Sequence, residues 1–358
     1  MLLRLRTPSP APSADSCQFA GQLVPEATQT AGGAQPSPVV TDRPVEAVST
    51  LPAGAAWRYG FGLSASADPL PWAQSLGAGW YLDWNTTARP ADAQLEHWLM
   101  VRVAPDCTRP TPDEAARLAK ERPGQTWIIG NEPDVIWQDN LTPEAYAAAY
   151  HAFYTAIKRA DPSAQIAVAG IAQPTPLRLA YLDRVLETYQ QTYGQAMPVD
   201  VWTVHNFVLR EERGGWGAEI PPGLDEVSSG QLTEIADHAR LDLFEAQLRT
   251  FREWMAQRGY RDTPLALTEF GILMPAEYGF PPEAVGTYLL ATMDLLSKLE
   301  DPATGYPLDS NHLVQRWAWF SLSDPIFPGS DLADLPSGKL TEVGEAFRQS
   351  VEAWAGAP

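Results

Sequence analysis

The feature that most constrains the fold of this chain is a short apolar run within residues 126–134, which have the sequence TWIIGNEPD. A run rich in β-branched and aromatic residues is typical of a buried strand, and the Gly and Pro that follow mark its end. Glu132 therefore stands at the carboxyl end of a strand. The pattern recurs in residues 264–271, PLALTEFG, where a second buried run ends at Glu269. The sequence thus places two glutamates at the ends of two buried strands.

Apolar runs and amphipathic helical segments alternate from residue 57 onward. We expect strands over residues 58–62, 79–84, 98–103, 126–132, 165–171, 199–205, 264–269 and 313–320. We expect helices from residue 111 and over residues 142–160, 177–193, 239–257, 282–299 and 341–354. Eight strands, each followed by a helix or a loop, are the count of an α/β fold of the (β/α)8 TIM-barrel type, whose active site lies at the carboxyl ends of the strands.

Two stretches fall outside this alternation. Residues 1–50 are rich in Pro, Ser and Ala and have no hydrophobic period, which predicts a disordered N-terminal tether before a single catalytic domain over residues 55–358. Residues 206–238 form a long Gly- and Pro-containing segment, which predicts a functional lid or wall, or else disorder.

The tether bears on where the protein works. Such tethers often join a secreted or surface-attached enzyme to its anchor, so we expect an extracellular or cell-surface location. The basic first six residues lack the apolar core of a signal peptide, which leaves the export route and a cytoplasmic location open. No run of about 18 apolar residues is present, so we expect no membrane-spanning segment.

The charge of the chain narrows the class of ligand. With 25 basic and 44 acidic residues the formal net charge is −19, which disfavours nucleic acid, because binding phosphates requires clustered Lys and Arg. A neutral substrate is expected instead. The 13 Trp residues are many for 358 residues, and exposed Trp side chains form platforms for flat, partly apolar ligands such as sugar rings.

The cysteines and histidines predict no metal site. The two cysteines, Cys17 and Cys107, make neither a disulfide framework nor a metal cluster, and their pairing stays open. The five histidines have no metal-ligand spacing. We expect neither a metal nor an organic cofactor.

The two strand-end glutamates suit chemistry on a glycosidic bond. On the fourth and seventh strands, Glu132 and Glu269 would project into the barrel mouth from opposite sides. Carboxyls about 5–5.5 Å apart act as general acid and nucleophile with retention of configuration, whereas a wider separation gives inversion. The acid needs a pKa raised by apolar surroundings or by the charge of the other carboxylate.

Three motifs resemble those of a known family: GNEPD at residues 130–134, TEFG at 268–271 and WAWF at 317–320. They resemble retaining (β/α)8 glycoside hydrolases that carry a catalytic Glu at the ends of strands four and seven. The likeness spans residues 57–354 and looks closest to the catalytic-core proteins that include endo-β-1,3-glucanases. It implies Glu132 as acid/base, Glu269 as nucleophile and Asn131 as the residue that binds the substrate 2-hydroxyl.

The sequence departs from that family at the end of strand six. Related enzymes often place a His there, followed two residues later by a Tyr that supports the nucleophile. Here the residues are His205, Asn206 and Phe207, so the Tyr is missing. We count His205 and Asn206 as substrate-binding candidates and Tyr278, shortly after Glu269, as a replacement for the Tyr.

Aromatic and charged residues near the strand ends supply further candidates. Trp317 and Trp319 share one face of a strand, and by resemblance we expect Trp319 to floor the sugar site, with Phe320 pointing away. Outer subsites are predicted from Trp80, Asp83, Trp84 and Trp137, with Trp216 in the long loop. An inward Arg58 or Arg102 would hold a catalytic carboxylate ionised, or would sit in a structural ion pair.

These observations favour a monomeric retaining β-glycoside hydrolase acting on an oligo- or polysaccharide, most readily a β-glucan. Two alternatives stay open: a sugar-binding barrel without catalysis, and a metal-dependent hydrolase with His205, Glu132 and Glu269 as ligands. Sugar identity, linkage and endo or exo action depend on the shape of the cleft, which sequence patterns do not give.

Overall fold

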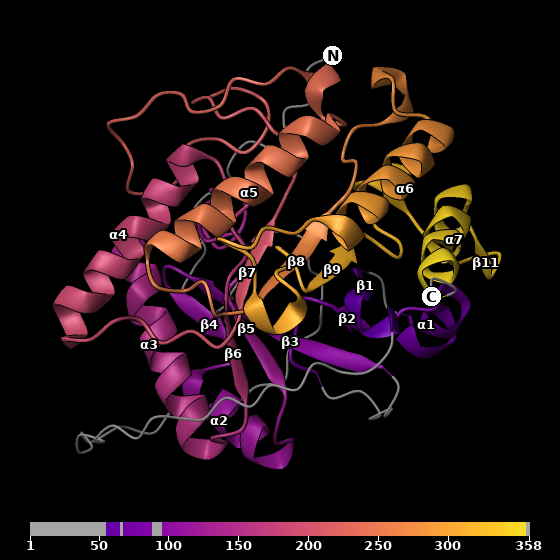
Figure 1. Cartoon of the computed structure of the whole chain (residues 1–358). Helices are drawn as coiled ribbons and strands as arrows, with labels where there is room; N and C mark the ends of the chain where they lie inside the picture. Colours follow the sequence, from indigo (N-terminus) through magenta and orange to yellow (C-terminus); the bar gives the residue numbers. More distant parts are fainter. Residues whose placement is uncertain (1–54, 65–66, 88–94, 356–358) are drawn as a thin grey trace.

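The computed structural model describes residues 55–64, 67–87 and 95–355, so the predicted disordered segment 1–50 lies outside it. Eight parallel strands follow one another around a barrel in the order of the chain. They are β1 (Tyr59–Gly62), β2 (Trp80–Leu82), β3 (Glu96–Ala104), β5 (Thr126–Ile129), β6 (Gln165–Val168), β7 (Trp202–His205), β8 (Leu265–Phe270) and β9 (Arg316–Trp319). A parallel bridge between Ala167 and Val201 joins β6 to β7 and nearly closes the barrel. The predicted TIM barrel is confirmed (Figure 1).

The helices pack around these strands (Figure 1). Their first turns follow the usual start signals: Thr111 and Glu114 form a capping box, and Pro stands near the start of five helices. The helices of the described part of the chain are α1 (Pro69–Leu76), α2 (Pro112–Glu121), α3 (Pro143–Ala160), α4 (Pro176–Tyr193), α5 (Leu241–Gln257), α6 (Pro282–Lys298) and α7 (Glu342–Ala355).

Small elements decorate the barrel. Strand β4 (Cys107–Arg109) pairs antiparallel with β3, and β10 (Ala333–Asp334) pairs with β11 (Lys339–Leu340). Cys107 is disulfide-bonded, and the only other cysteine in the sequence, Cys17, lies outside the described residues. Five short 3-10 helices lie in the connections: η1 (Ala55–Arg58), η2 (Ile235–Asp237), η3 (Ala276–Tyr278), η4 (Pro307–Asp309) and η5 (Pro328–Ser330).

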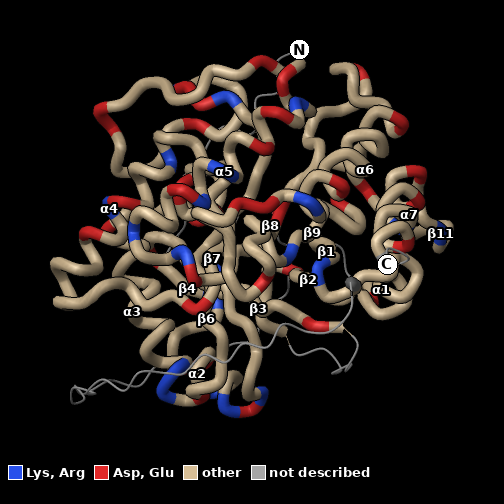
Figure 2. The backbone as a smooth tube through the Cα atoms, in the orientation of Figure 1, with Lys and Arg blue, Asp and Glu red and all other residues tan. Residues whose placement is uncertain are grey.

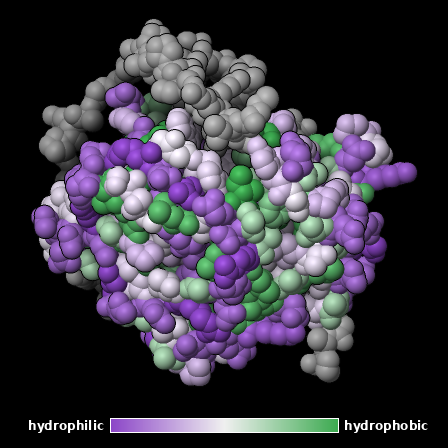
Figure 3. Space-filling view, turned by 90° about the horizontal axis from the view of Figure 1, so that it is seen from above, coloured by the Kyte–Doolittle hydropathy of each residue, from purple (hydrophilic) through white to green (hydrophobic). Residues whose placement is uncertain are grey.

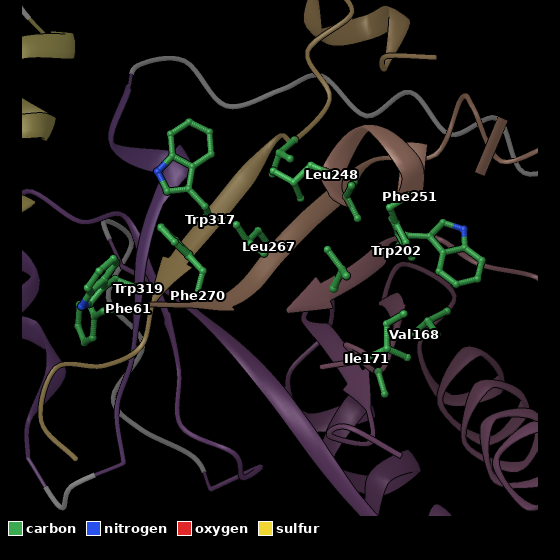
Figure 4. Close-up of a cluster of buried hydrophobic side chains, with 14 of the residues drawn as sticks. Phe61, Val168, Ile171, Trp202, Leu248, Phe251, Leu267, Phe270, Trp317 and Trp319 are labelled. Carbon is green, nitrogen blue, oxygen red and sulfur yellow. The ribbon is translucent and has the colours of Figure 1, made fainter. Parts of the chain in front are cut away.

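The strands are buried on both faces, as is usual for parallel sheets covered by helices. An outer cluster lies between strands and helices and includes Leu248, Phe251, Leu267 and Trp317, as Figure 4 shows. An inner cluster fills the barrel. Because both faces are apolar, hydrophobicity alone does not show which face of a strand points into the barrel.

The amino-terminal end of the barrel is held by ion pairs. Arg58, just before β1, donates to Asp309 at 2.8 Å and to the carbonyl of Gln315 at 3.0 Å. Arg316, at the start of β9, pairs with Glu96 at the start of β3. Arg58 therefore serves the structural ion pair that the sequence left open, at the end of the barrel away from the glutamates, and its prediction as a site residue is corrected.

The surface carries many acidic groups. Lys and Arg are interspersed with more numerous Asp and Glu over the fold (Figure 2). Seen from above, apolar side chains gather in a band near the middle of that face, among polar ones (Figure 3). None of the helices in the described ranges is long and apolar enough to cross a membrane.

Candidate active site

Glu132 is held by an unusual backbone turn at the end of β5. Gly130 has a φ of 99° and Glu132 a φ of 43°, both in the left-handed region. A Cβ at Gly130 would lie 3.0 Å from Val103 Cγ2. Glycine therefore suits this position both for its positive φ and for the lack of space. The amide of Glu132 donates to the carbonyl of Gly170 at 3.0 Å, which ties the turn to the end of β6. Non-glycine residues in this region cluster at functional sites.

Asp139 fixes the residue before the glutamate. Its buried carboxylate accepts from the amides of Asn131 at 2.7 Å and Val103 at 3.1 Å, and from Nε of Arg102 at 2.8 Å. Arg102 therefore supports the segment that carries Asn131 and Glu132 through Asp139. Sequence reasoning missed Asp139, since an acidic residue in an irregular loop carries no pattern.

The second glutamate and a histidine complete the constellation. Nδ1 of His205, at the end of β7, lies 2.9 Å from Oε1 of Glu132, and its Nε2 lies 3.5 Å from Oε1 of Glu269 on β8. One ligand-type atom from each of the three side chains lies within 4.8 Å of the others. The ring of His205 rests on Gly170, where a Cβ would come within 2.5 Å of it.

Burial and neighbouring charges shift the pKa values of Glu269 and His205. Burial raises the pKa of Glu269 to about 7; the charge of Glu132 adds to this rise, whereas His205, Trp84 and Arg102 oppose it. Burial alone would lower the pKa of His205, but the neighbouring glutamates outweigh it and raise that pKa. Glu269 and His205 thus both have raised pKa values within one buried cluster.

Trp84, predicted for an outer subsite, reaches the centre of the site. Its indole Nε1–H donates to Oε1 of Glu269 at 2.8 Å. Tyr278, the predicted replacement for the missing Tyr, ends η3 and packs against the outer cluster. Trp84 thus makes a direct contact with the second glutamate, which the sequence did not predict for it.

Two polar atoms at the centre have no hydrogen-bond partner within the described residues, namely Oδ1 of Asn131 and Nε2 of His205. Both side chains are buried. Since most buried polar atoms in proteins are hydrogen-bonded, atoms left without a partner beside two carboxylates are suited to meet a ligand.

The predicted sugar floor is corrected. Trp317 and Trp319 are fully buried in the outer cluster (Figure 4), where Trp319 packs edge-on against Phe270 and donates to the carbonyl of Ser330 at 2.8 Å. Phe320 belongs to the inner cluster, with ring centroids 5.7 Å from Trp84 and 6.1 Å from Phe207. The alternation along β9 was right but its phase was reversed.

Three other candidates face away from the centre. Trp80 is fully buried low in the barrel, where its indole donates to the carbonyl of Arg58 at 3.2 Å. Asp83 is buried and lies 2.8 Å from Nε2 of His97. Asn206 donates to the carbonyl of Phe244 in α5 at 2.9 Å. Their predicted contacts with substrate are therefore corrected.

The rim of the inner cluster is aromatic and apolar. Trp137 and Trp216 are partly exposed and pack against this cluster, together with Leu273, Met274 and Phe327. These residues come from the loops after β5, β7, β8 and β9. Whether Trp137 and Trp216 bind sugar rings at outer subsites stays a prediction.

A buried arginine ties the long loop to the catalytic segment. Arg178, in the first turn of α4, pairs with Asp134, lies 2.8 Å from Glu211, and donates to the carbonyls of Ala218 and Glu219 at 2.8 and 2.9 Å. Although burial opposes it, the charges of Asp134 and Glu211 raise the pKa of Arg178. Residues 206–238 are thus an ordered wall. Helix periodicity gave no signal for Arg178.

His238 joins two loops beside the site. Its Nδ1 lies 3.0 Å from the carbonyl of Val208, and its Nε2 accepts from the amide of Leu273 at 2.9 Å. Burial lowers the pKa of His238 to about 4, so the ring stays neutral, with its proton on Nδ1. The loop after β7 and the loop after β8 are held together by this ring.

Solved structures with a similar fold include β-1,3-glucanases. A GH128 (subgroup II) endo-β-1,3-glucanase from Pseudomonas viridiflava matches with a TM-score of 0.56 and 18% identity, over 81% of this chain and 96% of that one. A GH128 (subgroup I) endo-β-1,3-glucanase from Amycolatopsis mediterranei, in complex with laminaritriose, matches with a TM-score of 0.53 and 17% identity, over 82% and 99%.

A third similar structure has a different mode of action. It is a GH128 (subgroup III) curdlan-specific exo-β-1,3-glucanase from Blastomyces gilchristii, in complex with glucose, with a TM-score of 0.53 and 16% identity over 82% of this chain and 98% of that one. No family model and no curated protein matches the sequence. The likeness concerns the fold, and it confirms the predicted resemblance to endo-β-1,3-glucanase-like barrels.

Proposed function

We propose that the protein is a retaining glycoside hydrolase that cleaves β-1,3-linked glucan, with Glu132 as acid/base and Glu269 as nucleophile. The carrying observation is the approach of the two carboxylates, whose nearest atoms lie within 4.8 Å. This suits the spacing of about 5–5.5 Å in retaining enzymes, whereas inverting enzymes keep carboxyls about 6.5–9.5 Å apart to hold a water. The β-1,3 linkage follows by analogy with the similar solved structures.

In the first step, a carboxylate oxygen of Glu269 attacks the anomeric carbon while the glycosidic C–O bond breaks. The carboxyl proton of Glu132 passes to the departing sugar oxygen. Positive charge develops on the ring, which favours the ionised form of Glu269. Asn131, with its free Oδ1, is suited to accept a hydrogen bond from the 2-hydroxyl as that charge grows.

In the second step, the Glu132 carboxylate takes a proton from water, whose oxygen attacks the anomeric carbon. The bond to Glu269 breaks, and the β-configured sugar and the free carboxylate are restored. His205 lies 2.9 Å from Glu132 and faces Glu269 at 3.5 Å, so it is placed to orient one carboxylate and to moderate the charge of both.

The setting of the site agrees with a neutral polysaccharide. The partly exposed Trp137 and Trp216 offer apolar faces for sugar rings along the rim. The net charge of −19 disfavours polyanions. The disulfide at Cys107 is typical of oxidising compartments, which supports secretion or surface attachment.

Product analysis tests the proposal. Wild-type protein is incubated with laminarin, curdlan, cellulose, mannan and xylan, and the anomeric configuration of new reducing ends is followed by NMR. We expect cleavage of the β-1,3-glucans with β product appearing first. An α product appearing first would contradict the retaining mechanism. Binding of a glycan without any cleavage would favour the non-catalytic barrel.

A metal-dependent hydrolase is the second candidate, because Glu132, His205 and Glu269 each offer a ligand atom within 4.8 Å of the others. The 2.9 Å approach of Nδ1 to Oε1 instead fits a direct hydrogen bond between two of these groups. Assay after EDTA treatment and desalting separates the two. Full activity supports the hydrogen-bonded cluster, and a loss restored by added Zn²⁺ or Mn²⁺ would establish the metal.

A further inference from the structure

The position of the Trp84 indole beside Glu269 is set by two neighbouring residues and by the backbone of Trp84 itself. The indole passes over Gly62 at the end of β1, where a Cβ would lie 2.7 Å from its Cη2 atom. The ring of Phe320 meets it edge-on, with centroids 5.7 Å apart at 75°. Trp84 itself has a φ of 53°, in the left-handed region, and is 7% exposed. The direction of its N–H is therefore fixed by packing.

Both contacts to the Glu269 carboxylate converge on one oxygen. Trp84 Nε1 lies 2.8 Å from Oε1, and His205 Nε2 lies 3.5 Å from the same atom. An indole N–H only donates and does not ionise in the accessible pH range, so it favours the carboxylate form without exchanging a proton.

We propose that Trp84 is the positioning residue of the nucleophile: its N–H fixes Oε1 of Glu269 and leaves Oε2 to attack the anomeric carbon. The inference rests on the proposed hydrolase function for the attack, but the hydrogen bond itself is testable without turnover.

The first test uses NMR of protein with ¹⁵N-labelled tryptophan. The indole signal of Trp84 is assigned as the one lost in Trp84→Phe, and is followed from pH 5 to pH 9. We expect it to shift as the Glu269 cluster titrates, and this shift to disappear in Glu269→Gln. Arg102, Glu132 and His205 also act on Glu269, so loss in the Gln variant ties the shift to that carboxylate. A signal that does not respond to pH would overturn the proposal.

The second test uses kinetics on an aryl β-laminaribioside with an activated leaving group, which needs no proton from Glu132. Trp84→Phe should lower kcat about 10- to 100-fold, the usual effect of losing a hydrogen bond to a charged group, with little change in KM. The acidic limb of its pH profile should move upward by about half a unit or more, because the ionised nucleophile has lost a donor.

Trp98 provides a matched control. Its indole also donates to a glutamate, Oε1 of Glu96, at 2.8 Å, and it is also buried in the inner cluster. Trp98→Phe should leave kcat within about twofold and the acidic limb unmoved. If Trp84→Phe leaves the acidic limb where it was, or both variants move it equally, Trp84 is not the positioning residue.

Gly62→Ala keeps the indole and displaces it, so it should reproduce the kinetic effect of Trp84→Phe even if the latter variant folds poorly. A normal pH profile in Gly62→Ala, with the NMR shift of Trp84 abolished, would overturn the inference. Wild-type protein that gives the expected NMR shift but cleaves no β-1,3-glucan would refute the proposed function and leave the hydrogen bond established.

Discussion

The carboxylates at the two ends of the barrel have different partners. At the amino-terminal end, Asp309 is held by Arg58 and Glu96 by Arg316. At the carboxyl end, Glu132 and Glu269 face each other across His205. A guanidinium keeps its proton at any physiological pH, so the first end is a fixed clamp, whereas at the second end burial raises the pKa of Glu269 to about 7. Asp309 and Glu269 are both buried, and they differ in that Asp309 pairs with an arginine whereas Glu269 faces a histidine.

Removing the proposed nucleophile should give the largest loss of activity among the variants that test the difference between the two ends of the barrel. Glu269→Ala should reduce turnover of β-1,3-glucan by roughly 10⁴-fold or more, since no covalent intermediate forms. Azide added to this variant should restore turnover by attacking the vacated face. Initial rates of Glu269→Ala measured with and without azide test both the loss and the rescue. A normal rate in this variant would contradict the assignment of Glu269 as the nucleophile.

Loss of the acid/base should depend on the leaving group. Glu132→Ala should slow cleavage of glucan by about 10³-fold, but that of activated aryl glycosides far less, because only sugar leaving groups need a proton. Parallel assays on both substrates provide the measurement. Equal losses on the two would show that Glu132 is not the proton donor.

Breaking the clamp at the opposite end should affect stability instead of rate. Asp309→Ala leaves Arg58 buried without its carboxylate, which should lower the free energy of unfolding by about 4 kcal/mol. Urea unfolding measures this loss, while kcat per folded molecule should stay near the wild-type value. A large fall in kcat with unchanged stability would reverse the division between the two ends.

The free energy of unfolding should depend on pH, because ionising the buried Glu269 carboxyl destabilises the folded state. Glu269 has a folded-state pKa of about 7 against an ordinary 4.5, so the native state binds more protons in that window and stability falls as pH rises through it. The raised pKa of His205 acts with the same sign. Glu269→Gln should remove a fall of up to about 3 kcal/mol between pH 5 and pH 8. Thermal unfolding of both proteins across this range provides the comparison, and parallel curves would contradict it.

The barrel was predictable where the pattern was local. The run before Glu132 ends in Gly, Asn and Pro, and the run that ends at Glu269 is closely followed by Gly271. A parallel barrel brings the ends of its strands together without further information. The phase of β9 was not predictable, because residues 317–320 are apolar toward both faces. The sequence therefore did not distinguish inward from outward side chains, and we assigned the inward position to Trp319 where Phe320 holds it.

The contacts that refine the site are long-range and have no periodic signal. Trp84 meets Glu269 across 185 residues of chain, and Arg178 meets Asp134 across 44. Nothing at residue 84 distinguishes a packing tryptophan from a donor to a carboxylate until the folded barrel brings the two strand ends side by side. The same holds for Asp139, which supports Asn131 from an irregular loop.

The contacts of Arg178 limit how the loop 206–238 can be replaced by design. One side chain holds the wall 206–238 through Glu211 and two carbonyls, and holds the catalytic turn through Asp134. The wall is therefore not an interchangeable module. A loop transplanted from another barrel to alter chain-length preference has to bring its own carboxylate and carbonyls to Arg178, or the transplant will disturb the turn that carries Glu132.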